Sequence, residues 1–423
     1  MPQDKEDPNF VAFIGIDWAD EYHVIHLQAA GETKVISKKV NHTPEALNEW
    51  VGSLRQQFGE GPIAVCLEQS KGALINFLVD HNLFVLYPIN PKTLAKFREA
   101  FRPSGAKDDP DDADKLLEIV VHHRDKLTPW KPDEEIVRKI SIIARKRRQA
   151  VDRRKQVINQ LKAELKAYFP QALELTGEEI YSSLATDFLL KWPTLKDLQR
   201  ATDITIRKFY RDHHCYKNDI IETRLKLIRQ AQPLTTDRAI LETAPIEVRL
   251  LCQLLKQYSQ AINEYERQLK DLYPHHPDAD IFKSFPGSGP IHSARLASAF
   301  GTNRERYHTA DDMQKCSGVA PVTIESGKTH VVYARYKCPK YFRQSFIEYA
   351  GQSIQYSLWA SAYYQMQKKK GKGHHVILRA LAFKWIRIMF RCWKNRTPYD
   401  ELKYLKSLKK KGAEILNYLS ATV

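Results

Sequence analysis

Apolar residues in the first part of the chain gather in short runs that are separated by polar turns. Three runs cover residues 10–17, 22–29 and 33–40, and two more cover 62–68 and 83–87. Short runs rich in Val, Ile, Leu and Phe, bounded by turn residues, are typical of buried strands. The pattern therefore predicts five strands in this part of the chain.

The segments between the later strands have the helical period instead. Thr43 and Pro44 supply the capping chemistry that begins a helix, and the apolar residues after them recur every three or four positions. A second helix is predicted around 71–80. Three consecutive strands followed by alternating helices and strands predict an α/β domain, which we expect to end at residue 132.

From Asp133 onward the apolar spacing is helical almost throughout. Within 133–280, apolar residues of the segment 251–272 alternate spacings of four and three, which is the signature of a coiled-coil seam. This seam predicts a contact between subunits, although an antiparallel helix pair within one chain has the same pattern. Residues 171–245 are predicted to be mostly helical, and a third, mostly helical region is expected over 281–423.

Four carboxylates stand at the ends of these predicted elements. Asp17 and Glu68 each end an apolar strand. Asp109 and Asp112 lie three residues apart where a helical pattern begins, so they share one helix face. Acids in this arrangement can hold two divalent ions about 3.5–4 Å apart for phosphoryl transfer, and carboxylate oxygens suit Mg²⁺ or Mn²⁺. A plain helix cap is the alternative for Asp109, because Pro110 follows it.

Composition and charge narrow the range of partners. The chain has 66 Lys and Arg against 50 Asp and Glu, a net charge of +16 with a pI near 9.4. A chain this basic is expected to bind a polyanion, and nucleic acid is the first candidate. The sequence predicts neither a membrane span nor a signal peptide. Six scattered cysteines without a Cys-x-x-Cys pair argue against zinc and disulfides and favour a reducing cytoplasm.

Glycine-rich and basic segments mark candidate phosphate contacts. Gly287 and Gly289 precede an expected helix, where backbone N–H groups can approach a phosphate. Residues 366–396 interleave basic and aromatic side chains, which favours a nucleic-acid surface over a solvated face. Residues 325–329 resemble the end of a phosphate-binding loop, but Val322 occupies the required first glycine, so a nucleotide-hydrolysing motor is not expected. The predicted nucleic-acid contacts are Arg145, Arg147, Arg148, Gly287, Gly289, Lys328, Lys337, Arg343, Lys370 and Lys372.

Taken together, these motifs resemble the DEDD transposases of bacterial insertion sequences, a family related to the Piv and MooV invertases that includes the bridge-RNA-guided recombinases. In the first half, the resemblance rests on the segments around Asp17 and Glu68 and on 106–113, where Asp108 replaces the family's usual threonine. Residues 337–343 depart from the family pattern, because a glycine and an asparagine are missing there. The other segments that carry the resemblance are 90–91, 285–290, 316–321, 325–328 and 371–374.

The resemblance implies an RNase H-like (RuvC-like) catalytic domain over 1–132, a helical coiled-coil region over 133–280 and a transposase domain over 281–423. It also implies that Ser326 attacks DNA to form a phosphoserine intermediate, in one composite site with Mg²⁺ ions held by the four acids; Mn²⁺ is an expected substitute. The implied partners are DNA, a structured non-coding guide RNA, and further copies of the chain in a dimer or tetramer. The implied compartment is the bacterial cytoplasm or nucleoid.

Two other functions fit parts of the same pattern. A metal-only nuclease such as a junction resolvase would use the acids with water and leave Ser326 as an ordinary turn residue beside a glycine. A helical nucleic-acid-binding scaffold would use the acids only as helix caps. A covalent protein–DNA adduct separates the transposase from the nuclease, and metal-dependent cleavage separates both from the scaffold.

Overall fold

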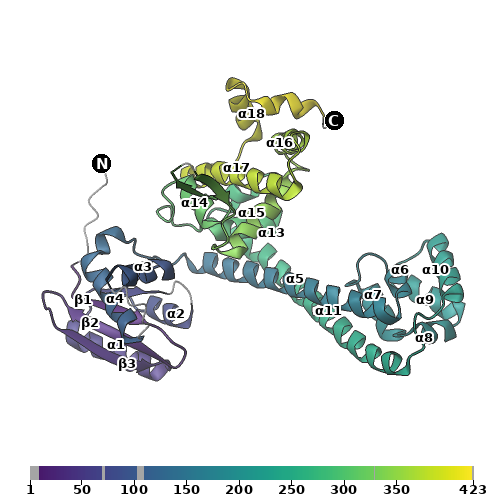
Figure 1. Ribbon diagram of the computed structural model, residues 1–423, viewed down its shortest axis with the longest axis horizontal. Coiled ribbons are helices and arrows are strands. Elements are labelled where there is room, and N and C mark those ends of the chain that lie inside the picture. Colours follow the sequence, from purple (N-terminus) through teal and green to yellow (C-terminus); the bar gives the residue numbers. More distant parts are fainter. Residues whose placement is uncertain (1–8, 69–71, 102–108, 328, 422–423) are drawn as a thin grey trace. The chain divides into compact units, whose positions relative to one another are not determined.

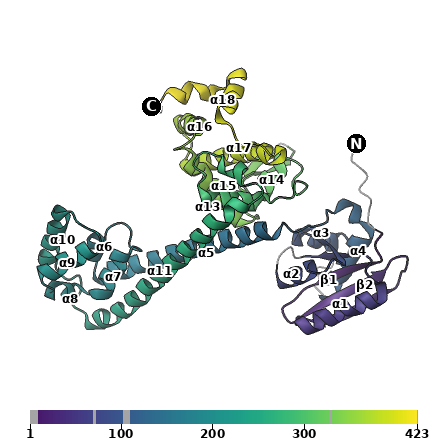
Figure 2. The same cartoon turned by 180° about the vertical axis from the view of Figure 1, so that it is seen from behind.

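The three-dimensional structure is a computed structural model of the 423-residue chain. It describes residues 9–68, 72–101, 109–327 and 329–421. The chain divides into two compact units, residues 1–132 and 133–423. Each unit is described by itself, and its elements can be followed in Figures 1 and 2.

The first unit is built on a five-stranded mixed sheet. The strand β2 runs antiparallel to β1 and β3, whereas β4 runs parallel to β1 and β5. All five strands agree with the predicted ones to within two residues at each end. In sheet order they are β3 (Val35–Asn41), β2 (Tyr22–Ala29), β1 (Ala12–Asp17), β4 (Ile63–Leu67) and β5 (Phe84–Pro88).

Helices cover both faces of this sheet. On one face, α1 (Pro44–Phe58) and α2 (Ala73–Val79) contribute to a core with β1, β2 and β4. On the other face, α3 (Pro91–Phe101) and α4 (Asp109–His122) form a second core with β4 and β5, and a 3-10 turn follows at Arg124–Lys126. Because successive strand side chains point to opposite faces, alternate residues of β1 and β4 belong to alternate cores.

The helix α4 approaches the centre of the sheet closely at Gly15 of β1. A Cβ atom at this position would lie 2.2 Å from the Ala113 carbonyl oxygen and 2.4 Å from the Leu117 amide nitrogen. Both are backbone atoms, so a side chain here would push the helix off the sheet. Because Asp112 immediately precedes Ala113, this contact fixes the place of that acid against β1.

Two long helices, α5 (Glu135–Tyr168) and α11 (Arg238–Leu272), run through the second unit. They pack along each other in opposite directions, as the ion pair between Arg147 and Glu266 and the hydrogen bond from Arg154 to Ser259 show. The apolar seam predicted in the segment 251–272 is filled within this one chain. Its buried members, Leu251, Leu255, Ile262 and Leu269, face the interior of the unit, so the structure has the antiparallel pair that was the alternative to a subunit contact.

The segment between the two long helices forms a small helical insert with its own core. Buried aromatic side chains, including Phe188 and Tyr210, pack there against the end of α5 and the beginning of α11. The insert is helical, as predicted. Its helices are α6 (Gln171–Thr176), α7 (Ser183–Lys191), α8 (Leu195–Arg200), α9 (Asp203–Asp212) and α10 (Asn218–Gln230).

The rest of the second unit is mostly helical and shares a core with the beginning of α5 and the end of α11. Trp385 and Trp393 are fully buried in this core, so they do not belong to the aromatic nucleic-acid surface that the sequence suggested. Among the described residues, no helix is long and apolar enough to cross a membrane. The elements are η2 (Tyr273–His275), α12 (Ala279–Lys283), α13 (Pro290–Phe300), α14 (Ala310–Cys316), β6 (Val322–Ser326), β7 (Thr329–Tyr333), α15 (Lys340–Ser353), α16 (Leu358–Lys369), α17 (His374–Asn395), α18 (Glu401–Lys410) and η3 (Glu414–Ala421).

Candidate active site and nucleic-acid interface

Two of the predicted acids lie side by side at one edge of the sheet. Asp17 is the last residue of β1, and Glu68 directly follows β4, whose Leu67 pairs with Ile16. Because β1 and β4 are parallel neighbours, their carboxyl ends meet at this edge. Strand alternation gives Asp17 the same face as Gly15, which is the face that α4 covers.

The third acid reaches this face from α4. Asp112 is buried and forms an ion pair with Arg98 of α3, in which Nη1 lies 2.8 Å from Oδ1 and donates a hydrogen bond to Oδ2 at 3.2 Å. The fourth predicted acid, Asp109, is the first residue of α4. The side chain of Asp109 and the whole of Asp108 lie outside the described part of the chain. The structure therefore does not test which of the two neighbours belongs to the set of acids.

The chemistry of the acids fits a hard divalent cation, since carboxylate oxygens are the ligands that Mg²⁺ and Mn²⁺ prefer. The carboxylate of Asp112 is already compensated by a cation, the guanidinium of Arg98. Among the described side chains, no three of His, Cys, Asp or Glu stand close enough together to hold a metal ion. The donor set is therefore suitable in kind, while its described members are not gathered around one point.

Ser326 lies at the tip of a two-stranded hairpin in the second unit. It ends β6, pairs with Thr329 of β7, and is followed by Gly327, whose φ of +55° suits the tight turn. The residue is exposed. The sequence predicted a turn at this point but not the strands on either side of it.

A carboxylate and an imidazole face each other next to this serine. The Nδ1 atom of His330 lies 2.9 Å from Oε1 of Glu325, and the two residues are cross-strand partners. Adjacent residues of a strand point to opposite faces, so Glu325 and His330 occupy the hairpin face opposite to Ser326. His330 is near Ser326 in sequence, but the hairpin does not direct its ring at the serine.

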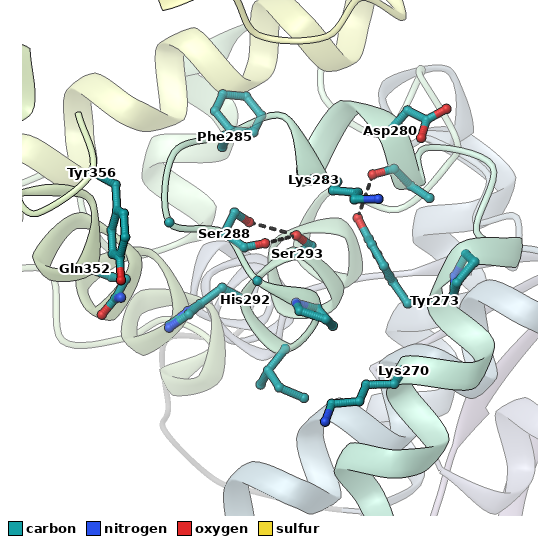
Figure 3. A pocket seen from close by; sticks show the side chains of 16 residues that line it. Lys270, Tyr273, Asp280, Lys283, Phe285, Ser288, His292, Ser293, Gln352 and Tyr356 are labelled. Atoms are coloured by element: carbon teal, nitrogen blue, oxygen red, sulfur yellow. Dashed lines mark hydrogen bonds between the residues drawn. The ribbon is translucent and has the colours of Figure 1, made fainter. Parts of the chain in front are cut away.

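A cavity of about 790 Å³ opens at the beginning of α13 (Figure 3). The predicted Gly287 and Gly289 line it, together with two exposed lysines, Lys270 and Lys283. Gly287 has a φ of +72°, and a Cβ atom there would lie 2.5 Å from the ring of Tyr356. The glycine thus lets an aromatic ring pack directly on the loop. The first N–H groups of α13, which have no partner within the helix, lie at the same cavity.

Three further polar residues of this cavity are buried or half-buried. The hydroxyl of Ser293 lies 2.8 Å from that of Ser288, and both residues are buried. Burial, and to a lesser degree the charge of Arg295, lowers the pKa of His292 to about 4, although Glu348 acts in the opposite direction. His292 is therefore neutral near pH 7, and its Nδ1 atom has no hydrogen-bond partner in the described structure.

The predicted basic contacts fall into two groups. On α5, Arg147 pairs with Glu266 of α11, and Arg148 pairs with Asp152 and with Glu348 of α15. These guanidinium groups hold helices together. Of the other predicted cations, Lys337 and Lys372 are exposed, and Lys370 forms a surface ion pair with Glu414. Arg145 and Arg343 are half-buried and donate hydrogen bonds to backbone carbonyl groups, and Lys328 lies outside the described residues.

Three exposed cations on α17 belong to the segment 366–396, which was predicted as a nucleic-acid surface. Lys384, Arg387 and Arg391 are spaced by three and four residues, so they share one helix face. The sequence from 349 to 399 contains no Asp or Glu, which is a further signal for a basic surface here. By contrast, no local pattern pointed to Arg98 or to Lys270, because each meets its site through the tertiary fold.

Comparisons with known proteins identify related transposases. A family model of the DEDD type found in IS110, described as "Transposase", matches residues 14–170. A second model, described as "Transposase IS116/IS110/IS902 family", matches residues 279–365. Together they match more than half of the chain. The first match includes all four predicted acids, and the second includes Ser326.

Relatives extend this similarity over nearly the whole chain. The chain is 26% identical over 402 residues to the mini-circle putative transposase for IS117 of Streptomyces coelicolor. This alignment covers 93% of this chain and 97% of that protein. It is 22% identical over 411 residues to the uncharacterized 43.6 kDa protein of insertion element IS110 from the same organism, covering 94% and 97%. A putative transposase, y4uE of Sinorhizobium fredii, is 28% identical over 214 residues, covering 49% and 58%. The chain belongs to the IS110/IS116 family of DEDD transposases, enzymes that cleave and join DNA.

Proposed function

We propose that this transposase moves its insertion sequence by site-specific recombination through a phosphoserine intermediate. Ser326 is the nucleophile, and Asp17, Glu68, Asp109 and Asp112 are the ligands of Mg²⁺ or Mn²⁺. The observation that carries the proposal is the meeting of Asp17 and Glu68 at one sheet edge, with Asp112 on the helix that covers the same face. A bound divalent ion would stabilise the charge that builds on the phosphoryl oxygens.

The covalent step is a transesterification. The Oγ atom of Ser326 forms a bond to the scissile phosphorus, and the bond from phosphorus to one deoxyribose oxygen breaks. The serine proton passes to solvent, and the released oxygen takes up a proton. Rejoining reverses these events with a new DNA hydroxyl as the nucleophile, so the phosphodiester is conserved and no external energy source is required. The exposed position of Ser326 at a hairpin tip supports this role, since a long polymer must reach the hydroxyl.

The proposed nucleic-acid interface lies on the second unit. The hollow at Gly287 and Gly289 receives a backbone phosphate, with Lys270 and Lys283 supplying charge. The row Lys384, Arg387 and Arg391 on α17 extends the interface, together with Lys337, Arg343, Lys370 and Lys372. Arg147 and Arg148 are left out of it, because their guanidinium groups already hold α5 against α11 and α15.

The proposal also includes a structured non-coding guide RNA and an assembly of two or four chains. The charge excess of +16 supports a large polyanionic partner. The choice of DNA target should then depend on RNA. A purified protein that selects its target with full specificity after nuclease has removed all RNA would contradict the guide, while leaving the recombinase chemistry in place.

The decisive experiment looks for a covalent adduct between the protein and DNA. Purified full-length enzyme, with its RNA, is mixed with end-labelled duplex containing an element end, with and without Mg²⁺, and run on a denaturing gel. Wild type should give a slow band that protease removes. Ser326→Ala should lose the band and all recombination but keep its fold, because one oxygen is removed from an exposed turn. Thr323→Ala, in the same hairpin, is the matched control and should resemble wild type.

The acids are tested in the same assay. Asp17→Asn, Glu68→Asn and Asp112→Asn should abolish strand cleavage and leave nucleic-acid binding largely intact, because affinity comes mainly from contacts of lysine and arginine with phosphates. Asp114→Asn, two residues along α4, should remain active. Metal-dependent cleavage that yields free ends without an adduct, both from wild type and from Ser326→Ala, would assign the protein to the metal-only nucleases.

A further inference from the structure

The side chains of Arg98 and Asp112 meet between α3 and α4, on the face of the sheet where the proposed catalytic acids lie. One guanidinium nitrogen of Arg98 reaches both carboxylate oxygens of Asp112, at 2.8 and 3.2 Å. The Asp112 side chain is only 10% exposed and that of Arg98 is 26% exposed. A carboxylate buried to this degree needs a counter-charge, because an unpaired buried charge is strongly unfavourable.

A metal ion at Asp112 would bind one or both of the oxygens that Arg98 contacts. Arginine stays protonated at every physiological pH, so the guanidinium cannot leave as a neutral group, and two cations cannot share so small a ligand without strong repulsion. Arg98 and a bound metal ion would therefore compete for the carboxylate of Asp112.

The surrounding packing decides which partner moves. The backbone of α4 is pressed against Gly15 through Ala113 and Leu117, and Asp112 is the immediate neighbour of Ala113. Its short side chain thus has little freedom to swing toward a metal elsewhere. Arg98 has a long side chain with several rotatable bonds and belongs to a different helix, so it can leave the carboxylate while Asp112 stays in place.

We propose that Arg98 is a positioning residue that holds Asp112 in the metal-free enzyme and is displaced when the metal ion binds. This inference rests on the proposed role of Asp112 as a metal ligand. It predicts that metal binding must first break the ion pair between Arg98 and Asp112. The affinity for the metal should therefore be lower than the acids alone would give.

The test measures metal affinity directly on the full-length protein without DNA. Mn²⁺ is titrated into wild type, Arg98→Gln, Arg98→Lys and Arg55→Gln, and free Mn²⁺ is followed by electron paramagnetic resonance. Arg98→Gln should bind at least about tenfold more tightly than wild type, because no charge-assisted hydrogen bond has to break first. Arg98→Lys keeps the charge without the planar fork and should fall between the two. Arg55, paired with Glu60 near the end of α1 on the other face of the sheet, is the matched control and should change nothing.

A stability measurement on the same proteins guards against simple misfolding. Without metal, Arg98→Gln should unfold at a lower temperature than wild type, because Asp112 loses a partner, and Mn²⁺ should raise its melting temperature by more than it raises that of wild type. Equal Mn²⁺ affinity in wild type and Arg98→Gln, with binding still lost in Asp112→Asn, would overturn the inference alone. Binding that survives Asp112→Asn would instead overturn the proposed metal role of Asp112.

Discussion

A pair of histidines, one of them buried, lies close to the end of β1. His23 of β2 is fully buried, its Nε2 atom lies 2.9 Å from Nδ1 of His42, and its Nδ1 atom accepts a hydrogen bond from the amide of Ala19 at 3.3 Å. Its strand neighbour Val24 pairs with Asp17. Burial, assisted by the nearby His42, lowers the pKa of His23 to about 4. The ring is therefore neutral wherever the first unit is folded near neutral pH.

This burial predicts a loss of stability in mild acid. In the unfolded chain a histidine titrates near pH 6.5, so between about pH 6.5 and pH 4 the unfolded state binds a proton that the folded state does not, and the free energy of unfolding must fall as the pH falls. The contribution of His23 should reach up to about 3 kcal/mol and level off below pH 4. Urea unfolding at a series of pH values, compared between wild type and His23→Gln, measures it. His122→Gln, on the exposed end of α4, should keep the wild-type slope; an unchanged slope in His23→Gln would contradict the prediction.

For single residues, the sequence predicted the place in an element better than the side chains that the residue contacts. It placed Asp17 and Glu68 at strand ends, and the structure has them there. It could not find Arg98 beside Asp112, because a contact between two helices depends on how they cross, and spacing along the chain does not report that. The same holds for Arg147 and Arg148, which look like solvent-facing cations in sequence and become ion-pair partners only when α11 and α15 pack beside α5.

Among the elements, the five strands of the first unit and its helices α1, α2 and α4 were predicted well because each combines a recurring pattern with a clear boundary, whereas α3 was not predicted. Thr43, for example, caps α1 by accepting the amide of Ala46. The hairpin of β6 and β7 was missed, since its strands are only five residues long and their side chains are largely exposed. The seam of α11 was found, but a heptad pattern identifies an apolar face without saying which helix covers it.

The contact of α4 with β1 predicts that Gly15 cannot be replaced. Gly15→Ala would place a methyl group within 2.4 Å of two backbone atoms of α4, so the helix must shift and carry Asp112 with it. We expect a loss of at least about 2 kcal/mol of stability and a loss of strand cleavage. Gly52→Ala is the control: this glycine lies inside α1 with no atom within 4 Å of the added Cβ, and the change should stabilise by roughly 0.5–1 kcal/mol. Thermal unfolding of both variants decides, and a Gly15→Ala protein as stable as wild type would show that α4 does not sit as described.

For the molecule as a whole, the excess of positive charge predicts steep salt dependence of binding. Each phosphate neutralised contributes about −0.9 to the slope of log affinity against log salt on duplex DNA. If the row on α17 contacts phosphates, Arg387→Gln with Arg391→Gln should reduce the slope by about 1.8. The double variant Arg207→Gln with Arg229→Gln is matched in charge but lies in the insert, where both arginines are ion-paired; its slope should match wild type. Fluorescence anisotropy at several salt concentrations measures both, and equal slopes in the two variants would remove α17 from the interface.

The insert between the two long helices has a consequence for how the second unit assembles. The core around Trp385 needs both Ala144 near the beginning of α5 and Leu269 near the end of α11, and all of α6–α10 lies between them in sequence. A flexible tether of that length would make each meeting of the two helices entropically costly. Instead, the insert's own core holds the end of α5 against the beginning of α11. This contact keeps the two helices at a high effective concentration with respect to each other. A cavity opened at Phe188 would thus weaken the assembly of a second core, to which this residue does not belong.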